Sequence, residues 1–380
     1  MRKAFISPSK YVQGENELLN LGYFVTSFGK KALLIGNQSD IDRVRDQLDY
    51  TAEKYQCTFI VAGFNGECSR NEVERLKKLA ITEHCDCTIG LGGGKAIDTA
   101  KCVAEGNAVI IVPTIAATDA PTSHSAVLYT EEGAFDDYAY FKQSPSVVLI
   151  DTQIIANAPV RFLVAGMGGA LSTYFEARAN QQSYANINAG LPCGVREGKC
   201  NGAKPTLAAY ALATLCYQTL LKDGKKAKVA CINKTVTPAL ENVIEANILL
   251  SGLGFESGGL AGAHAIHDGL TILEQTHHYY HGEKVAFGTL VQLVLENASE
   301  PELKEVLDFC LSVNLPVCLE DIGVKTITEE QLNAVAEKVI IPEESIHSMP
   351  FPITLENIKA AILTADSLGK NYKMLGKFTQ

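Results

Sequence analysis

The first 150 residues alternate short apolar runs with longer amphipathic stretches, and this alternation constrains the fold more than any other feature. The apolar runs have the length of buried strands, while the stretches between them, such as Asn71–Glu83, place apolar residues at helical spacing. Strands that alternate with helices form a parallel sheet joined by crossover helices. We therefore expect an α/β domain whose strands are Ala32–Ile35, Thr58–Ala62, Thr88–Leu91, Val109–Val112 and Val147–Ile150.

From about Pro159 the strand signal fades and helical patterns dominate. The sequence predicts two domains: residues 1–158, which are α/β, and residues 159–380, which are all-α. A polar stretch rich in Gly and Asn, Ser183–Lys204, has no periodicity and is predicted to be a loop or insertion. The predicted helices are Arg161–Gln181, Thr206–Leu221, Val236–Leu253, Leu260–Glu274 and Glu283–Asn297, with shorter ones towards the C-terminus.

Composition excludes several classes of function. With 47% hydrophobic and 20% charged residues, the chain has the balance of a packed globular protein. Its formal net charge of −10 argues against nucleic acid or an anionic membrane surface as a partner. No apolar run approaches the roughly 20 residues that cross a bilayer, and no signal peptide is visible. We therefore expect a cytoplasmic protein.

The cysteines indicate a reducing compartment and carry no predicted chemistry. They number eleven, are scattered, and lie mostly inside apolar runs, where they read as small hydrophobic residues. Neither the pair Cys85 and Cys87 nor the pair Cys193 and Cys200 has the spacing of a zinc site.

One strand candidate runs into a glycine-rich turn that could hold a phosphate. Thr88–Leu91 is followed by Gly92, Gly93 and Gly94, and Lys95 then opens a helix. Glycines let the backbone approach a pyrophosphate closely, and a helix N-terminus offers free N–H groups to an anion. The segment matches neither the G-x-G-x-x-G nor the Walker A pattern, so a simple tight connection explains it equally well.

Three segments in order along the chain resemble the glycerol dehydrogenases of the metal-dependent, iron-containing alcohol dehydrogenase superfamily. They are Gly92–Lys101, Pro113–Ser123 and Gly254–His267. The resemblance implies a dinucleotide-binding domain followed by a helical, dehydroquinate synthase-like domain that binds metal and substrate, with the active site between them. It implies oxidation of glycerol and similar vicinal diols to dihydroxyacetone, by hydride transfer to NAD with help from zinc. It also implies a homo-oligomer.

By matching position, the resemblance assigns cofactor and substrate contacts. Asp119 would orient the diol, although a turn residue before Pro121 is the alternative from local sequence alone. Asn37 stands where many members have an Asp that accepts from the adenosine ribose, so exclusion of NADP is in doubt. The other expected cofactor residues are Gly92, Gly93, Gly94, Lys95, Asp98, Thr114, Thr118, Ser123, Ser125 and Tyr129.

The resemblance also implies a metal site, but one ligand is missing. His264 and His281 match the two histidine ligands, which would make them catalytic together with Asp119. The third ligand of the family is an Asp, and Gly169 stands at that position. Members that bind iron add a His at the position of Thr173. Loss of an anionic ligand weakens metal binding.

Three explanations for Gly169 remain open: an engineered or spontaneous change, recruitment of another ligand, or a family branch without a tightly held metal. The alternative function is therefore an NAD-binding family member with an impaired metal site and little turnover. His267, three residues beyond His264, is one candidate for an outer contact of the metal or cofactor, and Asp268 is the nearest carboxylate in sequence but is not expected to be a ligand.

Rivals that share the fold, the dehydroquinate synthase-like lyases and glycerol-1-phosphate dehydrogenases, require basic residues for an anionic substrate. The matched segments offer little Lys or Arg beyond Lys95. A neutral diol is therefore the expected substrate.

Overall fold

The computed structural model describes residues 2–187, 189 and 202–378. Contacts divide the chain into two compact units. The N-terminal unit comprises Ile6–Leu163 and Val229–Gly252, and the helical unit comprises Met1–Phe5, Val164–Lys228 and Leu253–Gln380. The single boundary between residues 158 and 159 stays a prediction. Most of the loop predicted at Ser183–Lys204 lies outside the described residues.

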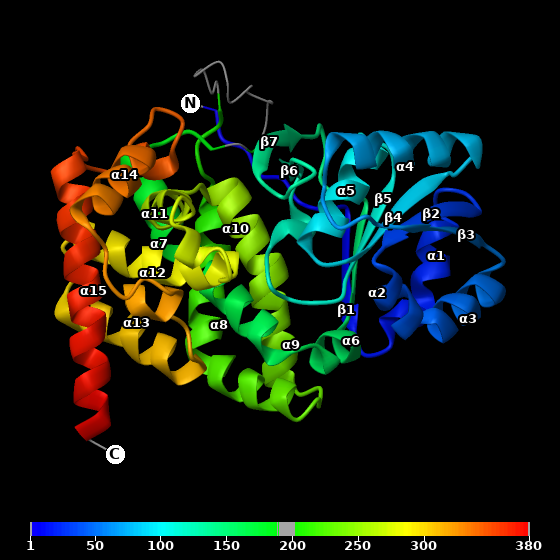
Figure 1. Cartoon of the computed structure of the whole chain (residues 1–380). Coiled ribbons are helices and arrows are strands. Elements are labelled where there is room, and N and C mark those ends of the chain that lie inside the picture. Colours follow the sequence, from blue (N-terminus) through cyan, green and yellow to red (C-terminus); the bar gives the residue numbers. More distant parts are fainter. Residues whose placement is uncertain (1, 188, 190–201, 379–380) are drawn as a thin grey trace. The chain divides into compact units, whose positions relative to one another are not determined.

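A six-stranded parallel sheet forms the centre of the N-terminal unit (Figure 1). Its strand order is β1-β8-β5-β4-β2-β3. The five predicted strands are confirmed. Four are runs of buried apolar residues, and β3, at the edge of the sheet, is only partly buried. The strands are β1 (Lys10–Gly14), β2 (Lys31–Gly36), β3 (Thr58–Gly63), β4 (Cys87–Gly92), β5 (Val109–Pro113) and β8 (Val147–Asp151).

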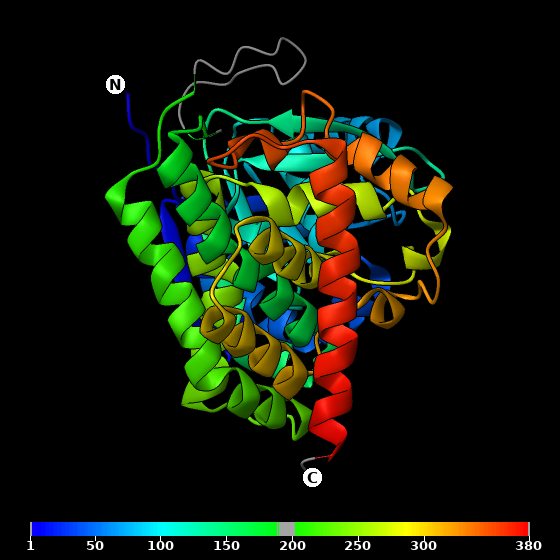
Figure 2. The ribbon, with the colours of Figure 1, turned by 90° about the vertical axis from the view of Figure 1, so that its left-hand side faces the viewer.

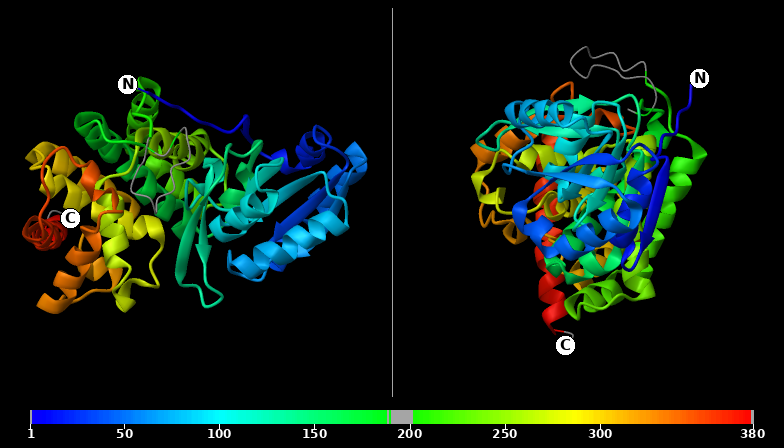
Figure 3. Two further views of the ribbon diagram at one scale, coloured as in Figure 1. Left: turned by 90° about the horizontal axis from the view of Figure 1, so that it is seen from above. Right: turned by 90° about the vertical axis from the view of Figure 1, so that its right-hand side faces the viewer.

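Helices cover both faces of this sheet, as crossover connections require (Figures 1 and 3). On one face, Leu34, Leu91 and Val112 join an apolar core with α1 (Leu21–Val25), α2 (Gln38–Arg43) and α3 (Arg45–Tyr55). On the other face lie α4 (Arg70–Thr82) and α5 (Gly94–Ala104). A β-carbon at Gly90 would stand 2.7 Å from the Ala100 β-carbon, so glycine lets α5 approach β4 closely.

A two-stranded antiparallel sheet, β6 (Ser125–Tyr129) and β7 (Phe135–Tyr140), was not predicted. It follows β5 through a short 3₁₀ turn, Ala120–Thr122. The unit is completed by α6 (Thr152–Asn157), by α9 (Pro238–Glu245) and by a π-helical turn, Ala246–Leu250.

The helical unit contains the long predicted helices except Val236–Leu253, most of which belongs to the N-terminal unit (Figure 2). In its described residues the only strand-like pairings are isolated bridges, and no described helix of the chain is long and apolar enough to cross a membrane. In Figure 2, α15 runs alongside α12 and α13. The helices are α7 (Val160–Ser183), α8 (Leu207–Ile232), α10 (Ser251–Gly258), α11 (Gly262–Leu270), α12 (His281–Leu295), α13 (Glu300–Val313), α14 (Glu329–Val339) and α15 (Leu355–Phe378).

The backbone of α7 touches the start of α12 directly. A β-carbon at Gly168 would stand 2.1 Å from the Gly282 carbonyl oxygen, and one at Gly282 would stand 1.8 Å from the Ala165 carbonyl oxygen. Only glycine fits at both positions. This contact fixes His281, the first residue of α12, beside the middle of α7.

Candidate active site

The predicted phosphate cradle, Gly92–Lys95, occupies the turn between β4 and α5 (Figure 1). Gly92 has φ +147°, a backbone conformation that favours glycine, and Gly93 is the N-cap of α5. The Thr118 hydroxyl lies 3.9 Å from the β-carbon position of Gly94, and Thr114 N–H donates to the Gly92 carbonyl oxygen at 3.0 Å. The structure thus brings the cradle and the segment after β5 together.

Lys95 and Tyr129, both predicted cofactor residues, are neighbours. The Lys95 ammonium lies 4.9 Å from the centroid of the Tyr129 ring and 2.5 Å from Glu67 Oε1. Sequence reasoning missed Glu67, which no local motif distinguishes. Because the Glu67 carboxylate pairs with the Lys95 ammonium, an anion that binds Lys95 would have to displace it.

Lys101, another residue that sequence reasoning missed, pins the segment after β5 to α5. The Lys101 ammonium is buried and donates to Asp98 Oδ1 at 3.1 Å, to the Ala120 carbonyl oxygen at 2.5 Å and to Ser123 Oγ at 3.1 Å. Asp98 also accepts from the Val127 N–H at 3.0 Å. Burial raises the pKa of the Asp98 carboxyl. Through these bonds Asp98 joins α5 to the segment after β5 and to β6. Its contact with a cofactor stays a prediction.

Asp119 lies at the N-cap of the 3₁₀ turn after β5, and the residues after α9 hold it there. Ser251 Oγ donates to Asp119 Oδ2 at 2.6 Å. The π-helical turn before Ser251 places Asn247 so that its amide donates to the carbonyl oxygens of Ala116 and Leu163, each at 3.0 Å. π-Helical turns often occur at functional sites. The fixed position of Asp119 suits orientation of a small ligand.

At the end of β2, Asn37 is the N-cap of α2, and its side chain makes no capping hydrogen bond. The buried carboxylate of Asp40, which pairs with Arg43, lies 3.4 Å from the β-carbon position of Gly92. A carboxylate is therefore present beside the cradle although position 37 lacks one. No sequence motif indicates this carboxylate, because Asp40 and Gly92 lie on different elements.

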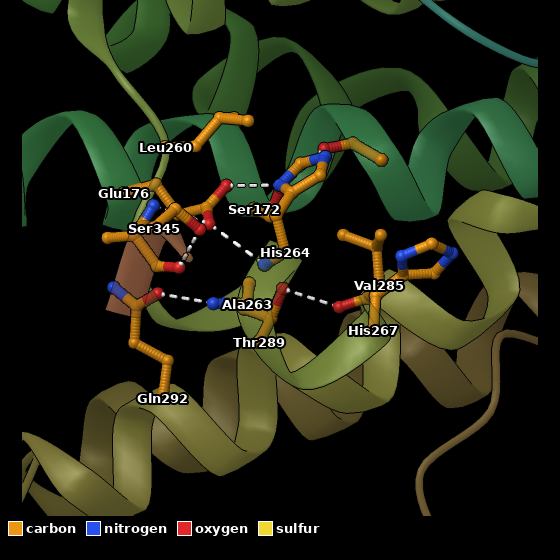
Figure 4. A network of polar contacts seen from close by, with 12 residues as sticks. Ser172, Glu176, Leu260, Ala263, His264, His267, Val285, Thr289, Gln292 and Ser345 are labelled. Atoms are coloured by element: carbon orange, nitrogen blue, oxygen red, sulfur yellow. Dashed lines mark hydrogen bonds and ion pairs between the residues drawn. The ribbon is translucent and has the colours of Figure 1, made fainter. Parts of the chain in front are cut away.

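In the helical unit, Glu176 of α7 caps the start of α11 (Figure 4). Its fully buried Oε1 accepts from the N–H groups of Ala261 and His264, at 2.8 and 2.9 Å. Its Oε2 lies 2.6 Å from Nδ1 of His264. N–H groups at a helix start have no partner within the helix, so a buried carboxylate is well placed there. The same bond orients the His264 ring and leaves Nε2 as its unprotonated nitrogen.

The second predicted ligand, His281, is oriented through His267. Nδ1 of His281 lies 3.1 Å from Nε2 of His267, whose Nδ1 lies 2.8 Å from Oδ1 of Asp268. Because Asp268 accepts from Nδ1 of His267, Nε2 of His267 is an acceptor and takes the Nδ1 proton of His281. Nε2 of His281 is then also unprotonated.

The two unprotonated nitrogens face each other. The distance between them shows whether one metal ion could bind both histidines. Nε2 of His264 and Nε2 of His281 lie 3.2 Å apart. At this separation one cation could lie within zinc–nitrogen bonding distance, about 2.05 Å, of both nitrogens. Two facing lone pairs are stabilised by a cation between them. The two imidazoles therefore fit a divalent metal.

A third protein ligand is absent from the described residues, where no group of three or more His, Cys, Asp or Glu side chains could hold a metal ion. A β-carbon at Gly169 would meet no atom within 4 Å, so packing does not explain the glycine. The backbone nitrogen of Gly169 lies 3.0 Å from the β-carbon position of Gly282, next to His281. Thr173 is buried against Gly254, so a histidine would not fit there without displacement.

Comparison with known proteins identifies the family. The family model of the iron-containing alcohol dehydrogenases matches residues 8–152. A glycerol dehydrogenase of Pseudomonas putida is 46% identical over 98% of this chain and 99% of its own length. The chain belongs to the iron-containing alcohol dehydrogenase family. The resemblance drawn from the three motifs is thereby confirmed.

Further relatives span the whole chain. A glycolaldehyde reductase of Halobacterium salinarum is 43% identical over 98% of this chain and 100% of its own length. The crystal structure of a glycerol dehydrogenase from Schizosaccharomyces pombe is 36% identical, covers 100% of this chain and 94% of its own, and superposes with a TM-score of 0.92. The fold class predicted from sequence is confirmed by this match.

Proposed function

We propose that the chain oxidises glycerol, or a similar small vicinal diol, to the corresponding ketone and transfers the hydride to NAD. The proposal is carried by one observation, the 3.2 Å approach of the Nε2 atoms of His264 and His281, each oriented by a partner on its other nitrogen. The packing of α11 and α12 does not itself require two unprotonated nitrogens to face each other. A cation-binding site requires this arrangement, because the cation is bound by both lone pairs.

The proposed roles follow from the contacts of each residue. His264 and His281 would hold the metal, which when bound would polarise the substrate hydroxyl, so that its proton is released to solvent as the hydride passes to NAD. Asp119, fixed by Ser251, accepts hydrogen bonds from the diol. Gly92–Lys95 hold the pyrophosphate, and displacement of Glu67 from Lys95 accompanies binding.

The proposed cofactor is NAD because of Asp40. Asp40 lies three residues beyond Asn37 and, although paired with Arg43, would supply beside the cradle some of the negative charge that position 37 lacks, which disfavours a 2′-phosphate. We expect kcat/KM for NAD to exceed that for NADP, and the Asp40→Asn variant to narrow the ratio by roughly tenfold, about 1.4 kcal/mol. An unchanged ratio would exclude Asp40 from cofactor selection.

The direct test is glycerol-dependent formation of NADH, followed by absorbance in excess zinc. The His264→Ala and His281→Ala variants are expected to lose activity, while His277→Ala, a surface histidine of the same unit, is expected to keep it. Glycolaldehyde reduction belongs in the same series, because a 43% identical relative is named for it. Full activity without either histidine would refute the proposal.

A second function is favoured by Gly169, namely a family member that binds NAD but turns over slowly because its metal is weakly held. The absence of a third ligand among the described residues supports it. Metal content and bound nucleotide, measured on the purified protein, separate the two. Bound nucleotide without metal supports the impaired form, and stoichiometric metal supports the active enzyme. A homo-oligomer and a cytoplasmic location are proposed from family membership.

A further inference from the structure

We propose that Asp268 is a positioning residue for metal binding, acting through His267 on the tautomer of His281. This inference rests on the proposed metal site. Asp268 does not form a third metal ligand with His264 and His281 in the described residues. It stands at the end of a chain of hydrogen bonds, from Asp268 Oδ1 to His267 Nδ1 at 2.8 Å and from His267 Nε2 to His281 Nδ1 at 3.1 Å.

The bond from Asp268 determines which nitrogen of His267 carries the proton. A neutral imidazole has a single N–H, and the two ring nitrogens of His267 face different partners, Asp268 and His281. An ionised carboxylate is only an acceptor, so the His267 proton lies on Nδ1.

The opposite tautomer would close the site. Without Asp268 as an acceptor, the His267 proton can lie on Nε2 and point at Nδ1 of His281. His281 would then carry its own proton on Nε2, directed at Nε2 of His264 only 3.2 Å away. A hydrogen bond between the two histidines would occupy both nitrogens that the metal needs. Asp268 therefore keeps the pair in the form that accepts a cation.

The two ligand histidines are thus supported differently. Glu176 orients His264 and also caps the backbone of α11, so its removal disturbs the helix itself. Asp268 contacts His267 and the carboxyl of Glu344, and its side chain is about one-third exposed. A change at Asp268 therefore alters the tautomer with little effect on the helix. Loss of such an outer partner typically weakens metal affinity 10- to 100-fold.

The test uses full-length Asp268→Ala and Asp268→Asn variants, with Glu274→Ala as a control that removes an exposed carboxylate nearby. Nitrogen-15 solid-state NMR of metal-free, histidine-labelled protein reports the tautomer of His267. Zinc affinity is measured by competition with a chelator. We expect an Nδ1-protonated His267 in the unchanged chain, its loss in Asp268→Ala, and a 10- to 100-fold weaker zinc Kd in that variant.

The amide oxygen of Asp268→Asn can still accept, so this variant should keep the His267 tautomer and most of the zinc affinity. If Asp268→Ala does not fold, Asp268→Asn still tests the inference, because a large loss of zinc affinity with an unchanged His267 tautomer would overturn it. An Asp268→Ala protein with unchanged tautomer and zinc Kd, or an equal loss in Glu274→Ala, would overturn the inference. Failure of the unchanged chain to bind zinc would instead overturn the proposed metal, because the tautomer measurement needs no metal.

Discussion

Replacing Gly169 with Asp is expected to supply a third metal ligand at little structural cost. A β-carbon at this position meets no atom within 4 Å, and helix propensity improves by a few tenths of a kcal/mol. Loss of an outer partner weakens metal affinity by up to about 100-fold. A direct anionic ligand should contribute at least this much, so we take an about 100-fold tighter zinc Kd for the Asp variant. At a zinc concentration about 100 times the Kd of the variant, zinc stabilises it by about 2.7 kcal/mol and the unchanged chain by about 0.4 kcal/mol.

The difference of about 2.3 kcal/mol is measured as the zinc-induced shift in Tm, which should be larger for the Asp variant by about 3 °C in a chain of 380 residues. Gly169→Ala is the matched control. It gains about 1 kcal/mol of helix propensity and should show no added response to zinc. Equal zinc affinities of the unchanged chain and the Asp variant would refute the reasoning, because the third ligand would then come from elsewhere.

Three further predictions concern stability. Lys101→Met leaves the Asp98 carboxylate buried without its cation and should cost about 3–5 kcal/mol in urea unfolding. Gly168→Ala places a methyl group 2.1 Å from the Gly282 carbonyl oxygen, so it should separate α7 from α12, lower Tm and weaken zinc binding together. Burial and the neighbouring Asp268 raise the pKa of Glu344 to about 7. Above about pH 4.5 this carboxyl has lost its proton in the unfolded chain but keeps it in the folded state. The free energy of unfolding should therefore fall as pH rises from about 4.5 to 7, by at most about 3 kcal/mol. Glu344→Gln should flatten this dependence in urea titrations at pH 5 and pH 8.

The parallel sheet was predictable because its central strands are continuous apolar runs. β1 and the β6–β7 hairpin were missed for a physical reason. β1 (Lys10–Gly14) is short, lies at the edge of the sheet and is only half-buried, and β7 carries two aspartates, so neither has the composition of a buried strand. Several predicted helices have shifted ends, because tertiary packing decides where α8 stops and where the π-helical turn interrupts Val236–Leu253.

The site was predictable only where family motifs carried it. The motifs assigned His264 and His281, and the structure brings their Nε2 atoms together. Glu176 was not found, since it lies on a different helix and 88 residues from His264. Asp268 was noted only as an adjacent carboxylate, and the structure shows it bonded to His267. Hydrogen bonds between side chains of different helices leave no periodic signal in a sequence.

The return of Val229–Gly252 to the N-terminal unit has a consequence for synthesis of the chain. Ser251 and Asn247, which fix Asp119 and its surroundings, are made more than a hundred residues after Asp119 itself. During translation, Val164–Lys228 of the helical unit are therefore made before the N-terminal unit is complete. Until then the Asp119 segment lacks its contacts with Asn247 and Ser251. We expect that expression of residues 1–163 alone would give a poorly folded fragment, and that adding residues 229–252 as a separate peptide would restore it in part.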